Sequence, residues 1–220
     1  MGGAPHGTVV VAGSQSHGKG RMGRQFISPE NGLYLSVILR PQLPAGELMH
    51  LTCCAGVAAC NAVAAVTGTR PGIKWINDLI FDGKKLGGIL TELGINPKTG
   101  YADYAVIGIG INCLDIPTDV ADMATCLSSM ADKPISPAVM AAALIQELGQ
   151  LDLTQKETLL EQYRRDCVTL GRQVRITGTQ ITATALDITH DGSLLIRLAD
   201  GSTQTVSSGE VSVRGMYGYT

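Results

Sequence analysis

Four short segments combine glycines with charged or amide side chains, and ligand chemistry is most readily placed there. The first, residues 18–24, reads GKGRMGR and carries Lys19, Arg21 and Arg24 among three glycines. Glycine lets backbone N–H groups approach a ligand closely, and lysine and arginine bind phosphate or carboxylate groups. The composition suits a loop that wraps an anionic ligand, and it suits a solvated basic loop equally well. It is not a P-loop, because the pattern G-x-x-x-x-G-K-[ST] is absent.

The second segment, residues 74–78, reads KWIND and ends a short β-rich run. Lys74, Asn77 and Asp78 supply a cation, an amide and a carboxylate at one place. Such a trio can hold a phosphate and a Mg²⁺ ion, because hard cations prefer oxygen ligands. A hairpin corner with Asn and Asp as turn residues is the structural alternative.

The third and fourth segments are apolar strands that contain glycines. Residues 84–90 read KKLGGIL and place Lys85 just before Gly87 and Gly88. Glycines inside a strand often mark the close approach of a ligand or another backbone, although a β-bulge beside solvated lysines is the alternative. Residues 108–112 read GIGIN, and the amide of Asn112 suits a purine edge or a phosphate. A tightly packed strand is the alternative there, and no third glycine completes a dinucleotide fingerprint.

The elements that must position these segments follow from hydrophobic patterning and turn signals. Ser136 is expected to cap a helix, Thr154 with Glu157 has the spacing of a capping box, and Gly68 is a natural helix stop. The expected strands are residues 8–12, 33–40, 73–76, 79–81, 86–93 and 104–112. The expected helices are residues 47–67, 120–130, 136–151 and 155–167.

The pattern changes near residues 169–171, where short β-rich runs replace the helices. The expected strands are residues 173–177, 182–189, 194–198, 203–206 and 211–213, with hairpin turns at 190–192 and 200–201. Five short strands in succession favour a small closed barrel. The chain is therefore divided into residues 1–169 and residues 170–220.

Composition limits the classes of function. Hydrophobic residues make up 45% and charged residues 16% of the 220 residues, which excludes global disorder. The net charge of −2 does not favour a nucleic-acid-binding surface. Apolar stretches are interrupted by Asn61, Thr67 and Gly68, so no membrane span is expected, and no signal peptide is visible. Six cysteines without a Cys-x-x-Cys pair indicate reduced core thiols and a cytoplasmic location.

The order of the four segments resembles that of the biotin protein ligases, also called biotin–[acetyl-CoA-carboxylase] ligases. Residues 15–24 resemble their glycine- and arginine-rich biotin and adenylate loop. Residues 74–79 (KWINDL), 85–92 (KLGGILTE) and 106–112 (VIGIGIN) are similar to their K-W-P-N-D-L, K-L-A-G-I-L-x-E and V-I-G-x-G-I-N segments. The resemblance covers nearly the whole chain. It implies an α+β fold, in which a biotin/lipoate ligase-like catalytic domain with a mixed sheet and helices on one face precedes a small SH3-like β-barrel.

The resemblance also implies roles for individual residues. Lys85 and Arg21 are expected to be catalytic and to meet the biotin carboxylate and the α-phosphate of ATP. Gly87 and Gly88 are expected to form a backbone wall against the biotin rings. Asn77, Asp78 and Asn112 are expected to lie by the ATP and Mg²⁺. The expected ligand-binding set is Gln15, Lys19, Gly20, Arg21, Arg24, Lys74, Asn77, Asp78, Lys85, Gly87, Gly88 and Asn112, and no protein metal ligand is assigned.

The implied activity is ATP-dependent formation of biotinyl-5′-AMP, followed by transfer of biotin to a lysine of a biotin carboxyl carrier protein. Two alternatives remain open: a lipoate or octanoate ligase on the same scaffold, and a non-catalytic biotin- or nucleotide-binding fragment. The second arises because the family's Ser-Thr-Asn segment does not precede residues 5–8, so that the chain is expected to be truncated at its N-terminus relative to the family. Lys19 stands where arginine is usual, Met22 replaces a basic residue, and Ile76 replaces proline. A homodimer is one expected assembly, no DNA-binding domain is visible in the chain, and no membrane partner is expected.

Overall fold

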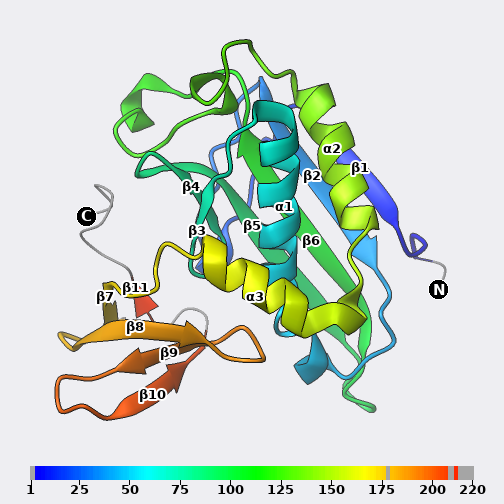
Figure 1. The fold of residues 1–220 in the computed structure, drawn as a ribbon. Coiled ribbons are helices and arrows are strands. Elements are labelled where there is room, and N and C mark those ends of the chain that lie inside the picture. Colours follow the sequence, from blue (N-terminus) through cyan, green and yellow to red (C-terminus); the bar gives the residue numbers. More distant parts are fainter. Residues whose placement is uncertain (1–2, 177–178, 208–210, 213–220) are drawn as a thin grey trace.

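The computed structural model describes residues 3–176, 179–207 and 211–212, and they form two antiparallel sheets with three helices (Figure 1). The larger sheet has six strands in the order β1-β2-β6-β5-β4-β3. Its strands are β1 (Thr8–Ala12), β2 (Gly32–Leu39), β3 (Gly72–Lys74), β4 (Asp78–Phe81), β5 (Lys84–Ile95) and β6 (Ala102–Asn112).

The α+β class is confirmed, but the larger sheet is not mixed. Every pair of neighbouring strands in it is antiparallel. The reason lies in the connections: β3–β4, β4–β5 and β5–β6 are joined by short hairpins, which reverse the chain direction each time.

Three helices cover one face of this sheet, namely α1 (Leu51–Thr67), α2 (Pro137–Gly149) and α3 (Lys156–Asp166) (Figure 1). Helix α1 is rich in small residues, and a Cβ atom added at Gly56 would lie 3.2 Å from the Ile73 side chain, so the helix packs close to the sheet. The expected stop at Gly68 is confirmed by its φ of 73°. The expected cap at Ser136 is also confirmed, because its side chain accepts a hydrogen bond from the Val139 N–H.

One apolar segment departs from the expectation that nothing is long enough to span a membrane. Residues Ala45–Thr67 have a mean hydropathy of 1.6 over the best window and are long enough by that measure. Of that window, 67% is buried inside the protein. Its apolar side chains therefore form the core between α1 and the sheet, with Leu51, Val57 and Val63 almost fully buried.

Two local predictions are wrong. The helix expected over residues 120–130 is replaced by short 3₁₀ turns, Thr118–Val120 and Leu127–Ser129, because the intervening backbone pairs with the strand at Lys85. The capping box expected at Thr154 does not form, since α3 begins at Lys156 without a side-chain cap. Instead the Thr154 N–H donates to the Asp152 carboxylate at 2.9 Å.

The smaller sheet has the strand order β10-β9-β8-β7-β11. The strands are β7 (Gln173–Ile176), β8 (Thr182–Ile188), β9 (Leu194–Arg197), β10 (Thr203–Val206) and β11 (Val211–Ser212). The hairpin turns expected at residues 190–192 and 200–201 join β8 to β9 and β9 to β10. The expected strand ends at residues 177 and 213 lie outside the described residues. Figure 1 places this sheet beside α3, on the side of β3.

Candidate active site

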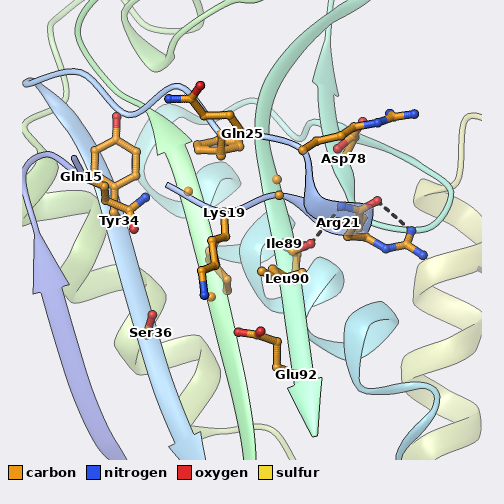
Figure 2. A pocket seen from close by; sticks show the side chains of 18 of the residues that line it. Gln15, Lys19, Arg21, Gln25, Tyr34, Ser36, Asp78, Ile89, Leu90 and Glu92 are labelled. Atoms are coloured by element: carbon orange, nitrogen blue, oxygen red, sulfur yellow. Dashed lines mark hydrogen bonds between the residues drawn. The ribbon is translucent and has the colours of Figure 1, made fainter. Parts of the chain in front are cut away.

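The face of the larger sheet opposite the helices carries a cavity of about 490 Å³ (Figure 2). Its floor is formed by β2, β5 and β6, its cover by the loop before β2, and one end by the residues that join β3 to β4. Side chains alternate along a strand, so Leu33, Leu35 and Ile107 are buried in the core on the helix face. The floor positions on the opposite face are Tyr34, Ser36, Gly88, Leu90, Glu92, Val106, Gly108 and Gly110.

Glycines keep this floor flat where three strands meet. Gly88 pairs with Gly110 and Leu90 pairs with Gly108 across β5 and β6. A Cβ atom added at Gly108 would meet nothing closer than 3.7 Å, so the space above it is open. A Cβ atom added at Gly110 would lie 2.6 Å from the Phe26 ring. The close approach that the glycines indicated is therefore made in part by an aromatic side chain of this protein.

The loop of residues 15–26, which we call the basic loop, folds back on itself over the cavity. The Gly20 N–H donates to the Arg24 carbonyl at 2.7 Å, and the Phe26 N–H donates to the Gly18 carbonyl at 2.9 Å. At the start of the loop, Gln15 Nε2 donates to Ser28 Oγ at 2.9 Å. Figure 2 shows Lys19 extending from this loop toward Ser36 and Glu92 on the floor.

Two cations are held at one end of the cavity by neighbouring residues of the β3–β4 connection. Lys85 Nζ lies 2.5 Å from Asp78 Oδ1, and Arg21 Nη1 donates to Asn77 Oδ1 at 3.2 Å. Lys85 Nζ also lies 5.7 Å from the centroid of the Phe26 ring. Arg21 and Lys85, 64 positions apart in the sequence, thus place a guanidinium and an ammonium beside the same Asn-Asp pair.

Burial changes the pKa values of the cationic side chains at the Asn77-Asp78 end of the cavity. Burial lowers the pKa of Arg21 from its usual value, and the Asp78 carboxylate opposes that shift. Burial also lowers the pKa of Lys74, where Asp78 again opposes and Lys85 reinforces the shift. Arginine stays protonated at any ordinary pH. The cavity therefore offers cations that are partly stripped of water, which strengthens their attraction for an anionic ligand.

Hydrogen bonds on both sides fix the backbone of Lys85. The Lys85 N–H donates to the Met123 carbonyl at 2.8 Å, and the Lys85 carbonyl accepts from the Thr125 N–H at 2.9 Å. Asn112 Nδ2 donates to the Thr125 carbonyl at 2.9 Å. Residues 123–125 thus form an isolated β-bridge to Lys85, which explains why the expected helix is absent there.

Ten of the twelve expected ligand-binding residues line the cavity, and two do not. Asn112 is engaged with the backbone of Thr125 and lies behind Lys85. Gly87 lies against the backbone of β6, where an added Cβ atom would overlap the Gly110 carbonyl oxygen. The lining members of the set are Gln15, Lys19, Gly20, Arg21, Arg24, Lys74, Asn77, Asp78, Lys85 and Gly88.

The sequence reasoning did not single out the aromatic part of the cavity. The Phe26 and Tyr34 rings pack edge to face with centroids 6.3 Å apart. Burial raises the pKa of Tyr34 to about 12, and its hydroxyl donates to the Pro29 carbonyl at 2.9 Å. Phe26 lies two residues after Arg24, but nothing in the local sequence indicates that its ring lies on Gly88 and Gly110, 62 and 84 residues away.

The described residues offer no ready-made metal centre. Within residues 3–176, 179–207 and 211–212, no group of three His, Cys, Asp or Glu side chains converges on one point. The carboxylate nearest the two cations, Asp78, is already paired with Lys85. A metal ion at this end would need most of its oxygen ligands from a bound molecule, as Mg²⁺ commonly takes them from phosphates.

Comparison with known proteins accounts for both parts of the chain. Residues 2–112 match the biotin/lipoate A/B protein ligase family, and residues 169–214 match the biotin protein ligase C-terminal domain. The bifunctional ligase/repressor BirA of Bacillus spizizenii is 36% identical over 217 residues, which cover 93% of this chain and 66% of that protein. The biotin–[acetyl-CoA-carboxylase] ligase of Mycobacterium tuberculosis is 30% identical over 216 residues, which cover 93% of this chain and 78% of that protein.

A solved structure of a biotin protein ligase has the same fold as this chain. The biotin protein ligase from Aquifex aeolicus in complex with biotin and ATP superposes with a TM-score of 0.80 at 29% sequence identity, covering 96% of this chain and 90% of that one. This chain spans 66% of the length of its two Bacillus relatives. The two family matches, the relatives and the shared fold agree, and the chain belongs to the biotin protein ligases of the biotin/lipoate A/B protein ligase family.

Proposed function

We propose that the chain activates biotin with ATP as biotinyl-5′-AMP and then transfers biotin to a lysine of a biotin carboxyl carrier protein. One observation carries the proposal: Lys85 and Arg21 meet at the Asn77-Asp78 pair, at the end of a cavity with a glycine floor. The similar Aquifex aeolicus enzyme was solved with biotin and ATP. A cavity of about 490 Å³ lies within the usual range for small-molecule sites.

In the first step, a biotin carboxylate oxygen attacks the α-phosphorus of ATP. A P–O bond forms, the bond to the β-phosphate oxygen breaks, and pyrophosphate leaves. Two anions must come together, so charge neutralisation and alignment are the main tasks. Lys85 and Arg21 are proposed to supply this charge, with Lys74 and Arg24 adding to the positive field at the same end.

In the second step, the neutral amine of the acceptor lysine attacks the acyl carbon of the mixed anhydride. A C–N bond forms, AMP leaves, and the amine proton is lost to solvent. No protein nucleophile is needed for either bond change. The basic loop is proposed to cover the anhydride and keep water away from it.

The remaining assignments are part of the same proposal. Gln15, Lys19, Gly20 and Gly88 are proposed to contact biotin or the adenylate, and Mg²⁺ would arrive with ATP because the described residues hold no metal centre of their own. Residues 1–169 are proposed as the catalytic domain and residues 170–220 as the small SH3-like domain. All six cysteines are free thiols, which supports a reducing compartment such as the cytoplasm.

The deciding experiment is mass spectrometry of a purified carrier domain incubated with this chain, biotin and ATP. A mass gain of one biotinyl group on the acceptor lysine is expected. Omission of ATP, or replacement of the acceptor lysine by arginine, should abolish the gain. A parallel reaction with lipoate in place of biotin tests the alternative substrate, and modification by lipoate alone would refute the proposal.

A further inference from the structure

The loop that positions Asn77 and Asp78 is held from four directions. The Trp75 N–H donates to Thr169 Oγ1 at 2.9 Å, and the Ile76 carbonyl accepts from the Tyr163 hydroxyl at 3.1 Å. The Asn77 carbonyl accepts from the Ile89 N–H at 2.9 Å. The fourth contact comes from the smaller sheet, where the Trp75 indole Nε1 donates to the Gly192 carbonyl at 3.0 Å. Trp75 is 7% exposed, so this last bond is shielded from water.

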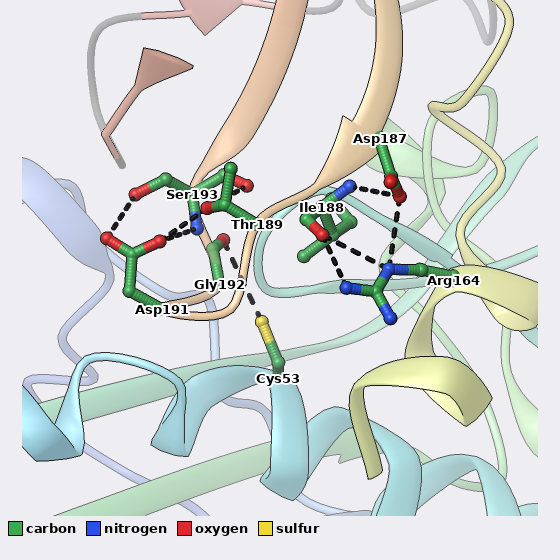
Figure 3. Close-up of polar contacts among 8 residues, drawn as sticks. All are labelled: Cys53, Arg164, Asp187, Ile188, Thr189, Asp191, Gly192 and Ser193. Atoms are coloured by element: carbon green, nitrogen blue, oxygen red, sulfur yellow. Dashed lines mark hydrogen bonds and ion pairs between the residues drawn. The ribbon is translucent and has the colours of Figure 1, made fainter. Parts of the chain in front are cut away.

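The turn that carries Gly192 is internally ordered, as Figure 3 shows. The Ser193 hydroxyl and N–H both donate to the Asp191 carboxylate, and the Thr189 hydroxyl donates to it as well. The Gly192 N–H donates to the Thr189 carbonyl at 2.9 Å. These bonds leave the Gly192 carbonyl pointing into the catalytic part, where the thiol of Cys53 also donates to it.

Only glycine fits at the tip of this turn. Gly192 has a φ of 86°, in the left-handed region that disfavours other residues. A Cβ atom there would lie 3.0 Å from Cys53 Sγ and 3.3 Å from His50 Cα. The turn therefore packs directly against the start of α1 and contacts Trp75 of the 75–77 loop.

A second anchor ties the smaller sheet to the catalytic part but does not touch the 75–77 loop. Arg164 on α3 donates to the Ile188 carbonyl from both Nε and Nη2, at 3.1 and 2.7 Å, and pairs with Asp187 at 3.0 Å (Figure 3). The two anchors can thus be separated by mutation. Arg164 attaches the sheet, whereas the Gly192 carbonyl also reaches a residue that lines the active-site cavity.

We propose that Trp75 is a positioning residue, through which the 189–193 turn of the smaller sheet fixes the loop that presents Asn77 and Asp78 to Arg21 and Lys85. The proposal rests on the function proposed above. It makes the smaller sheet a part of the adenylation site, although none of its described residues lines the main cavity. The effect should fall on the rate of adenylate formation, because the loop orients the cations that meet the phosphate, and not on the binding of biotin to the glycine floor.

Trp75→Phe in the full chain tests this, because it keeps an aromatic ring and removes the indole donor. The single-turnover rate of pyrophosphate release should fall about three- to tenfold, the loss expected for one buried hydrogen bond. The Kd of biotin measured without ATP should stay within about twofold. Gly192→Ala leaves Trp75 intact and should give the same separation of rate from binding, because the turn must shift.

Arg164→Gln is the matched control. It should lower the melting temperature by loosening the attachment of the smaller sheet, while the adenylation rate of folded enzyme stays at the parent value. An unchanged rate in Trp75→Phe would overturn the proposal, and so would equal rate losses in Trp75→Phe and Arg164→Gln. If the parent chain forms no adenylate at all, the proposed function itself fails, which is a different result from an active parent with an insensitive Trp75.

Discussion

Adding a methyl group to the glycine floor should weaken biotin binding while stabilising the fold. Gly108 is half-buried on β6, and an added Cβ atom would lie 3.7 Å from the Leu90 carbonyl oxygen and 3.8 Å from Ser36 Oγ, which is ordinary contact. Gly108→Ala should therefore raise the free energy of unfolding by about 0.4–1 kcal/mol, because it restricts the unfolded chain. The same methyl projects into the cavity, where one extra carbon costs about 1–3 kcal/mol of binding, or roughly 10–200-fold in Kd.

The matched variant is Gly87→Ala, one strand away and off the cavity. Its methyl would overlap the Gly110 carbonyl oxygen and lie 3.3 Å from Ile111 Cα, both of them backbone atoms that cannot turn aside. The free energy of unfolding should drop by about 1–3 kcal/mol, as in other overpacked cores. Urea unfolding and calorimetric titration with biotin measure the two quantities separately. A Gly108→Ala protein that binds biotin as tightly as the parent would show that biotin does not lie on this floor.

Three further predictions concern the charged groups. Lys85→Ala should keep the fold but reduce adenylate formation by at least about a hundredfold, as followed by pyrophosphate release; an unchanged rate would remove Lys85 from the mechanism. Arg21→Gly should speed the release of preformed adenylate, measured as its off-rate, because the contact to Asn77 is lost; equal off-rates in variant and parent would contradict this. Burial lowers the pKa of His50 below its usual 6.5, so the folded protein binds fewer protons than the unfolded chain, and stability should fall as the pH drops below about 6.5. His50→Leu should flatten that decline in urea titrations at several pH values, and an identical decline would place the acid-sensitive group elsewhere.

Much of the fold follows from local sequence signals. Glycine at residue 68 and serine at residue 136 end and begin helices for steric and hydrogen-bonding reasons that involve only nearby residues. The same holds for the turns at residues 190–192 and 200–201. These elements can be predicted from the sequence because the interactions that stabilise them involve residues that are close in the sequence.

Predictions failed where a distant partner decides the conformation. Residues 123–125 have no strong strand pattern, yet their backbone pairs with Lys85, almost 40 positions earlier. Thr154 could have capped α3, but its hydroxyl and its N–H both donate to the Asp152 carboxylate.

The basic loop, the Asn-Asp pair and the Lys-Gly-Gly strand were each ambiguous when taken separately, and only their order identified them. The structure adds the reason that they belong together, since two of them supply cations to the third. Phe26 was missed because a ring that rests on glycines is recognised only when the strands are paired.

The fixed backbone of Lys85 separates two kinds of motion in the site. Its N–H and carbonyl are both engaged by residues 123–125, so its ammonium can exchange Asp78 for an incoming anion only by rotation about its own side-chain bonds. Arg21, in contrast, sits on a short 3₁₀ turn beside Met22, which is 70% exposed. One cation thus extends from a strand whose backbone is held on both sides, while the other belongs to the loop that covers the cavity. The first can be redirected without any change in the backbone, whereas the position of the second depends on the conformation of the loop.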